Sequence, residues 1–271
     1  MKNNPYIGPR PFQRGERRNF YGRNREARDL FALIKAERVV LFYAQSGAGK
    51  TSLLNAQIIP ELEEEGFHVL PMARVSGDLP PGVDQKSVSN IFVFSAIIGL
   101  TGQDNPAEAL VHHTLSSFLR EHCAAAEGEE EKLPILILDQ FEEILTTHRD
   151  RWQEARGFFE QLAEALREIP TLGVVLAMRE DHVAGLDPYA ALLPKRLRTR
   201  FRMELLGRQG ALEAIKARGA DLVSVRYRRG RAAGGRSEPH QVPTPRRLAR
   251  GRAGAFRRAG ATPGRLQPVV G

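Results

Sequence analysis

Short apolar runs alternate with amphipathic segments along most of the chain. The apolar runs, which indicate strands, cover residues 38–43, 67–73, 133–138, 172–177 and 201–205. Segments with apolar residues at helical spacing cover residues 24–36, 50–62, 88–100, 107–123, 152–168 and 212–217. The runs at 133–138 and 172–177 are apolar on both faces, which is typical of strands buried in a parallel sheet. This alternation predicts a three-layer α/β sandwich with a mainly parallel central sheet.

A glycine-rich loop joins the first apolar run to the helical segment after it. Its sequence, Ala44-Gln45-Ser46-Gly47-Ala48-Gly49-Lys50-Thr51, matches the phosphate-loop pattern G-x-x-x-x-G-K-[ST] except that alanine occupies the first position. Glycines let successive backbone N–H groups surround a phosphate, the lysine reaches the β- and γ-phosphates, and the hydroxyl holds Mg²⁺. The start of the following helix adds a favourable dipole. We therefore expect this loop, together with Ser52, to bind the phosphates of a nucleotide with Mg²⁺; the alternative is a turn that binds nothing.

An aspartate follows the buried run at residues 133–138. Ligands of open α/β sheets bind at the carboxyl ends of the strands, so Asp139 is expected to hold Mg²⁺ together with Thr51. Its alternative role is to cap the helix that begins just after it. Beyond it, Glu142 and Glu143 are candidates to polarise an attacking water molecule, which hydrolysis requires. Either glutamate is alternatively a solvated acid in the first turn of a helix.

A basic residue ends the next apolar run. The sequence Val174-Val-Leu-Ala-Met-Arg179-Glu-Asp181 places the guanidinium of Arg179 at the same edge of the predicted sheet. We interpret Arg179 as a sensor of the γ-phosphate. A salt bridge with Glu180 or Asp181 is the alternative.

Positive charge is concentrated near the carboxyl end of the chain. Residues 1–217 contain 27 Lys and Arg against 30 Asp and Glu, a net charge of −3, whereas residues 218–271 contain 13 Arg, no Lys, one Asp and one Glu, a net charge of +11. Apolar periodicity is absent after Tyr227, so we expect residues 218–271 to be a disordered Arg/Gly-rich tail after a nucleotide-binding domain at residues 1–217. Three interpretations of this tail stay open. It is the product of GC-rich coding DNA read out of frame, a solvated linker, or an arm that binds nucleic acid.

Two further features concern the location of the protein. No apolar run approaches the roughly 20 residues that a membrane span needs, and the amino terminus does not resemble a secretion signal. A single cysteine, Cys123, allows no internal disulfide, as expected in a reducing compartment. We therefore expect a cytoplasmic protein that does not enter a membrane.

Three segments together carry a resemblance to a known family. They are Asn4-Pro-Tyr-Ile-Gly-Pro-Arg-Pro-Phe12 followed by Phe20-Tyr-Gly-Arg23, the phosphate loop, and Leu136-Ile-Leu-Asp-Gln-Phe-Glu-Glu-Ile-Leu145. The combination resembles the bacterial STAND class (signal transduction ATPases with numerous domains) of P-loop NTPases, specifically the group called novel STAND NTPase 1. The resemblance covers residues 4–216.

The resemblance implies an AAA+/STAND-like P-loop fold and an ATP-operated switch. Such a switch holds ADP at rest, exchanges it for ATP on a signal, and then oligomerises or releases an effector. The resemblance also places Phe20, Tyr21, Gly22 and Arg23 against the nucleotide base. The helical and repeat domains that usually follow are not seen here, so we expect a slowly hydrolysing switch module from a larger protein. It would self-associate through the NTPase domain, and its protein partners would bind domains that are absent.

A second functional hypothesis belongs to a different class of protein. In it the chain is a nucleic-acid-binding protein that uses the Arg-rich tail, and the NTPase core is accessory. Nucleic-acid affinity that falls steeply with salt and vanishes on deletion of residues 218–271 would favour this hypothesis.

Overall fold

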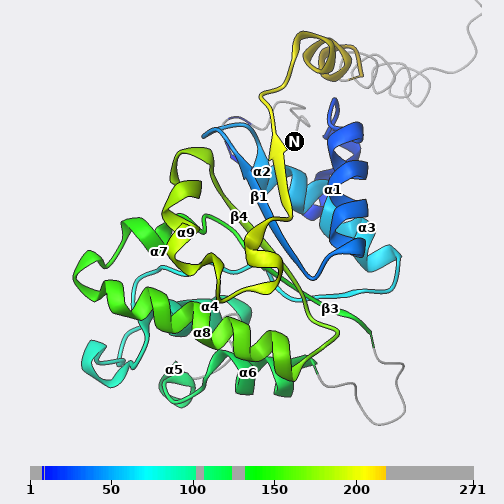
Figure 1. The fold of residues 1–271 in the computed structure, drawn as a ribbon. Coiled ribbons are helices and arrows are strands. Elements are labelled where there is room, and N and C mark those ends of the chain that lie inside the picture. Colours follow the sequence, from blue (N-terminus) through cyan, green and yellow to red (C-terminus); the bar gives the residue numbers. More distant parts are fainter. Residues whose placement is uncertain (1–7, 9, 102–106, 124–131, 218–271) are drawn as a thin grey trace, which may run out of the picture. The chain divides into compact units, whose positions relative to one another are not determined.

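A parallel sheet of five strands lies at the centre of the computed structural model, which describes residues 8, 10–101, 107–123 and 132–217 (Figure 1). The strands are β1 (Val39–Ala44), β2 (His68–Val69), β3 (Pro134–Leu138), β4 (Gly173–Arg179) and β5 (Arg200–Met203). Their order in the sheet is β2-β3-β4-β1-β5, and every neighbouring pair is parallel. All five carboxyl ends therefore meet at one edge, which confirms the predicted parallel sheet.

Helices connect the strands. The α-helices are α1 (Asn24–Ala36), α2 (Lys50–Leu53), α3 (Ile59–Glu64), α4 (Ile91–Thr101), α5 (Ala107–Leu110), α6 (Leu115–Cys123), α7 (Glu143–Thr146), α8 (Trp152–Glu168) and α9 (Asp187–Ala190). Turns of 3-10 helix cover Arg14–Asn19, Gln85–Ser87, Arg149–Arg151, Glu180–Leu186 and Pro194–Leu197. A further helix covers residues 208–217.

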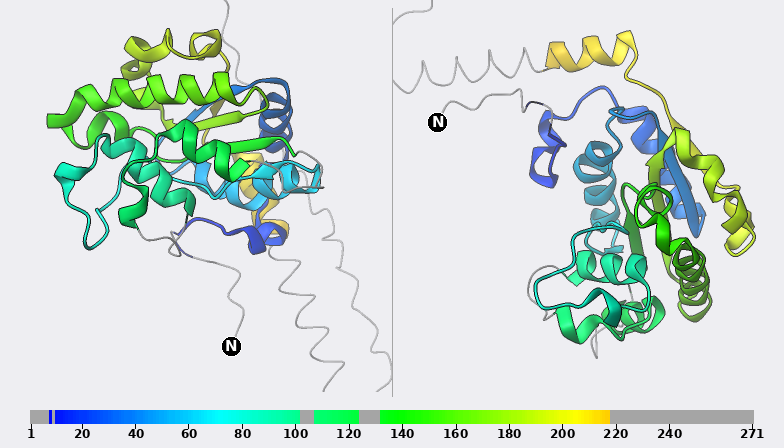
Figure 2. Two further views of the ribbon diagram at one scale, coloured as in Figure 1. Left: turned by 90° about the horizontal axis from the view of Figure 1, so that it is seen from below. Right: turned by 90° about the vertical axis from the view of Figure 1, so that its left-hand side faces the viewer.

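The alternation of side chains along the strands sets the two helical layers. In β1, Val39 and Leu41 belong to one buried cluster, whereas Val40, Phe42 and Ala44 belong to the other. The first cluster includes residues of α4, α6 and α8, and the second includes residues of α1, α2 and α3. The two groups of helices thus cover opposite faces of the sheet, as the three-layer prediction requires (Figure 2).

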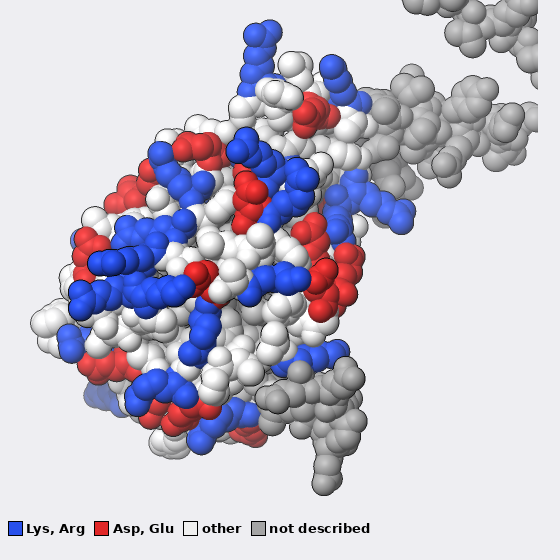
Figure 3. Space-filling model, turned by 45° about the vertical axis from the view of Figure 1, so that its right-hand side comes forward, with Lys and Arg blue, Asp and Glu red and all other residues white. Residues whose placement is uncertain are grey.

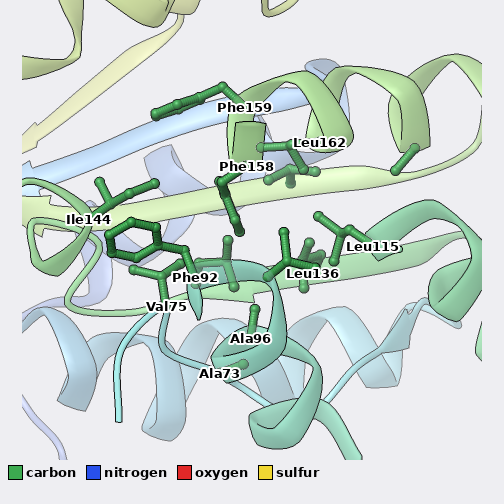
Figure 4. Packing of buried hydrophobic residues seen from close by; sticks show 14 of the residues in the cluster. Ala73, Val75, Phe92, Ala96, Leu115, Leu136, Ile144, Phe158, Phe159 and Leu162 are labelled. Carbon is green, nitrogen blue, oxygen red and sulfur yellow. The ribbon is translucent and has the colours of Figure 1, made fainter. Parts of the chain in front are cut away.

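The larger cluster packs α4 and α8 against the sheet (Figure 4). Phe158, Phe159 and Leu162 of α8 are fully buried, as are Phe92 of α4 and Leu136 of β3. Burial of one such side chain contributes about 1.5–3 kcal/mol to folding. This packing fixes β3 and β4, whose carboxyl ends carry the candidate site residues.

Polar caps and one proline change several predicted boundaries. The single helix predicted at residues 107–123 is wrong, because α5 ends at Leu110 and Thr114 caps α6: the N–H of Ser117 donates to Thr114 Oγ1 (3.1 Å). The helix predicted from residue 88 begins at Ile91, since Asn90 Oδ1 accepts the N–H groups of two first-turn residues.

The helix predicted at residues 50–62 and the strand predicted at residues 67–73 are also irregular. A π-helical stretch at Leu54–Ile58 separates α2 from α3, and it lies just before Pro60, which has no N–H for a helical hydrogen bond. The predicted second strand shortens to two residues, although Ala73 still forms a parallel bridge with Leu138.

Charged side chains of both signs are interspersed on the face shown in Figure 3. Among the described residues, ion pairs at 2.6 Å join Arg14 to Glu63 and Lys35 to Glu65.

None of the helices within the described ranges is long and apolar enough to cross a membrane. The tail at residues 218–271 and its predicted disorder lie outside the described residues, and the domain boundary at 217 stays a prediction.

Candidate nucleotide-binding site

The glycine-rich loop connects β1 to α2 at the carboxyl edge of the sheet. Gly47 and Gly49 have φ angles of +75° and +97°, which favour glycine because it lacks a side chain. Ala44, which replaces the first glycine of the pattern, is the last residue of β1 and has an extended backbone. Alanine adopts that conformation without strain, so the departure from the pattern leaves the loop intact.

Asp139 and Thr51 meet beside this loop. Thr51 Oγ1 donates a hydrogen bond of 2.6 Å to Asp139 Oδ2. Asp139 is 4% exposed, and its second oxygen, Oδ1, is buried without a hydrogen-bond partner among the described residues. A buried carboxylate oxygen without a partner is unfavourable, so it fits a cation that would bind it.

The donor set of this pair suits Mg²⁺. Carboxylate and hydroxyl oxygens are ligands of hard cations, and Mg²⁺ usually takes one or two protein oxygens together with substrate phosphates and water. Within the described ranges no group of three or more His, Cys, Asp or Glu residues is placed to hold a metal alone. The pair therefore fits a magnesium ion that arrives with a phosphate ligand.

Lys50 begins the helix after the loop. Its ammonium Nζ lies 3.5 Å from the carbonyl oxygen of Ala44. Burial lowers the pKa of Lys50, while the nearby carboxylates of Glu142 and Asp139 oppose that shift. An anionic ligand would favour the charged form of this lysine, so a phosphate group suits the position.

The two adjacent glutamates point in different directions. Glu142 Oε2 accepts the backbone N–H of Arg179 (3.1 Å). Glu142 also lines a hollow beside the phosphate loop, which is described below. Glu143 is absent from that lining, and its carboxylate pairs with Arg74, whose Nε lies 3.1 Å from Glu143 Oε2. Of the two candidates, Glu142 alone thus borders the hollow.

Arg179 also borders the hollow, but its guanidinium has a partner. Its Nε and Nη2 donate to the two carboxylate oxygens of Asp181 at 3.0 and 2.5 Å. The hydrogen bonds raise the pKa of Arg179 and lower the pKa of Asp181. The salt bridge predicted as the alternative role of Arg179 is therefore present, and Arg179 borders the hollow as well.

A hollow of about 360 Å³ collects these groups. Its lining residues are Gly8, Arg10, Pro11, Ser46, Gly47, Gly49, Lys50, Thr51, Ser52, Asp139, Gln140, Glu142 and Arg179. Most of the residues expected to bind phosphate or metal are thus together; Gln45 and Ala48 belong to the loop without lining the hollow.

The segment expected to contact the nucleotide base contacts the phosphate loop but does not line the hollow. None of Phe20, Tyr21, Gly22 and Arg23 lines the hollow. Arg23 is 4% exposed, and its Nη2 donates to the carbonyl oxygen of Ala48 (3.1 Å). Arg23 therefore supports the phosphate loop through a buried hydrogen bond to its backbone.

Sequence reasoning gave no role to four of the lining residues. Gly8, Arg10 and Pro11 belong to the first family motif, which was the available signal for them. Gln140 follows Asp139 with a φ of +51°, a conformation that only the folded structure reveals.

One protein family matches the chain. A family model described as novel STAND NTPase 1 matches residues 5–233, which extends beyond the expected domain end at residue 217. Among proteins with curated descriptions, none matches the chain.

Two solved structures are similar to the chain at low sequence identity. A Walker-type ATPase of Pyrococcus abyssi has a TM-score of 0.52 and 16% identity, covering 79% of this chain and 61% of its own. The ORC2 protein of Aeropyrum pernix, solved with ADPNP and ADP, has a TM-score of 0.42 and 17% identity, covering 68% of this chain and 47% of its own. The chain thus spans less than two thirds of the length of each of these two proteins.

Proposed function

Because the chain belongs to the novel STAND NTPase 1 family, we propose that it is an ATP-binding switch module that hydrolyses ATP slowly in the cytoplasm. The observation that carries the proposal is the contact between Thr51 and Asp139, 88 positions apart, beside Lys50. A phosphate loop and an acid at the carboxyl end of another strand of the same sheet are the two parts that P-loop NTPases use to hold nucleotide with Mg²⁺.

Binding is assigned to the loop and to the Thr51–Asp139 pair. The backbone of residues 45–49 and the ammonium of Lys50 would hold the phosphates of ATP or ADP. Thr51 and Asp139 would hold Mg²⁺, which neutralises charge on the phosphates when it is bound. The base would be recognised near Phe20–Arg23, as the family resemblance implies.

Hydrolysis is assigned to Glu142 in preference to Glu143. Glu142 borders the hollow, whereas the carboxylate of Glu143 is paired with Arg74. Arg179 borders the hollow and would contact the γ-phosphate with the N–H groups that do not bond to Asp181. As the family resemblance implies, the protein would also transduce a signal, self-associate and bind protein partners.

Phosphate release from Mg-ATP tests this function. We expect slow turnover by the parent protein, loss of turnover in Lys50→Ala, and parental turnover in Lys86→Ala, which removes an exposed lysine that does not line the hollow. Lys86→Ala is thus a matched control for charge. Turnover that survives Lys50→Ala would mean that the hollow is not the hydrolytic site.

A further inference from the structure

An amino-terminal segment forms one wall of the nucleotide hollow. Gly8, Arg10 and Pro11 line it together with Lys50 and Thr51. These three residues lie in the first motif of the family resemblance, to which the proposed function gives no task. The side chain of Arg10 therefore borders the space that a nucleotide would occupy.

The segment is attached to the helical region that follows the phosphate loop. The N–H of Phe12 donates to Ser52 Oγ (3.2 Å), and the ring of Phe12 packs edge-on against Phe20 with centroids 5.2 Å apart. The next turn forms ion pairs with α3, including Arg14 with Glu63 at 2.6 Å. This end of the wall is therefore held against the loop region by backbone, ring and charge contacts.

Glu16 orients the side chain of Arg10. Arg10 Nη1 donates to Glu16 Oε2 (2.8 Å) and Nη2 donates to Glu16 Oε1 (2.5 Å). Glu16 is itself fixed, because it also accepts the N–H of Gln13 (2.9 Å). The hydrogen bonds from Arg10 are the main cause that lowers the pKa of Glu16 to about 2, so the pair stays charged at neutral pH.

The pair leaves part of the guanidinium available. A guanidinium has five N–H donors. Besides the two bonds to Glu16, Nη1 donates to the carbonyl oxygen of Pro11 (3.1 Å). Among the residues that the structure describes, the Nε–H and the second Nη2–H of Arg10 have no acceptor.

We infer that Arg10 is a further cationic ligand for the phosphates of the bound nucleotide, and that Glu16 is a positioning residue for it. The inference rests on the proposed function. A triphosphate carries more negative charge than one Mg²⁺ and one lysine neutralise. A planar guanidinium suits phosphate oxygens because it donates parallel hydrogen bonds.

The competing explanation is that Arg10 and Glu16 form only a surface ion pair. Arg10 is 49% exposed, and exposed pairs contribute about 0–1 kcal/mol to stability. That explanation predicts no effect of Arg10 on nucleotide affinity. The two explanations therefore differ in a quantity that a binding assay measures.

The dissociation constant of Mg-ATP tests the inference. We expect Arg10→Ala to weaken binding about tenfold or more, the scale of a lost charge-assisted hydrogen bond. Arg14→Ala is the matched control: it removes an exposed, ion-paired arginine of the same segment that does not line the hollow. It should leave the dissociation constant within about twofold of the parent value.

A double-mutant cycle tests the role of Glu16. Glu16→Gln should weaken Mg-ATP binding in the parent background but not in the Arg10→Ala background, because it acts through Arg10. An equal loss in both backgrounds would overturn the positioning role, since a general structural effect does not depend on Arg10.

The remaining outcomes separate this inference from the proposed function. If Lys50→Ala abolishes binding while Arg10→Ala binds like the parent, the role of Arg10 is wrong and the nucleotide site stands. If Lys50→Ala also binds like the parent, the proposed function itself fails. Arg10→Ala could also lower the unfolding temperature of the nucleotide-free protein more than Arg14→Ala does. In that case the Mg-ATP affinity of Arg10→Lys decides. An affinity restored by lysine supports the phosphate contact, and an affinity that lysine does not restore overturns it.

Discussion

The hydroxyl of Thr51 and the carboxylate of Asp139 lie 2.6 Å apart although 88 positions separate them in the chain. The contact forms because β1 and β3 both flank β4 and run parallel to it, so the residues that follow them meet at one edge. Asp139 keeps a second oxygen that is buried and has no partner among the described residues. The pair is thus arranged for a cation.

Removal of the Asp139 carboxylate should abolish the effect of Mg²⁺ on nucleotide binding. In the parent protein we expect Mg²⁺ to tighten ATP binding; in Asp139→Ala the affinities with Mg²⁺ and with a chelator should be similar, because Thr51 alone is a poor ligand. Titration with ATP under both conditions measures this. Asp150→Ala, an exposed aspartate outside the lining, is the control, and a full Mg²⁺ effect in Asp139→Ala would refute the assignment.

The two neighbouring glutamates should respond differently to loss of their charge. Glu142→Gln should lower ATP turnover by about 10² or more while ATP still binds, the scale of a positioned acid–base group. Glu143→Gln should keep parental turnover, since the carboxylate of Glu143 is paired with Arg74. Phosphate release and ATP binding are measured for both variants. Equal losses of turnover in both would contradict the assignment to Glu142.

Gly22 should not accept a side chain. Its φ is +84°, and a Cβ atom there would lie 2.5 Å from the carbonyl oxygen of Gly210. Gly22→Ala should lower the free energy of unfolding by about 1–3 kcal/mol, measured by urea denaturation. Gly15→Ala is the control, because a Cβ at Gly15 meets nothing within 4 Å. A Gly22→Ala protein as stable as Gly15→Ala would mean that the close approach relaxes freely.

Cys123 should react slowly with alkylating reagents in the folded protein. Burial raises the pKa of its thiol from the usual 9.0 to about 11, and only the thiolate is reactive. At pH 8 alkylation should therefore be about 100-fold slower than in urea-unfolded protein, and its rate should rise with pH towards about 11. Mass spectrometry follows the modification. Similar rates in folded and unfolded protein would show that the thiol is not shielded.

Long helices with one apolar stripe were predictable from the sequence. The structure has Asn24–Ala36 and Trp152–Glu168 with the predicted ends. The break between α5 and α6 was not, since apolar spacing continues across it while a local cap at Thr114 begins a new helix. Periodicity reports burial, whereas caps depend on individual polar contacts.

The candidate site was predictable to a similar extent. The phosphate loop and Asp139 follow from strand ends in a parallel sheet. Which of Glu142 and Glu143 borders the hollow depends on tertiary contacts, such as the pair between Glu143 and Arg74. The wall that contains Arg10 depends on tertiary contacts, such as the hydrogen bond from Phe12 to Ser52.

Calorimetric titration of Mg-ATP into the parent protein, Lys50→Ala and Lys86→Ala tests the central claim, nucleotide binding at this loop, most directly. The structure predicts one saturable site in the parent and in Lys86→Ala, and loss of measurable binding in Lys50→Ala, because Lys50 supplies the cation of the loop. Lys50→Ala protein that is folded and binds Mg-ATP as tightly as the parent would contradict the account.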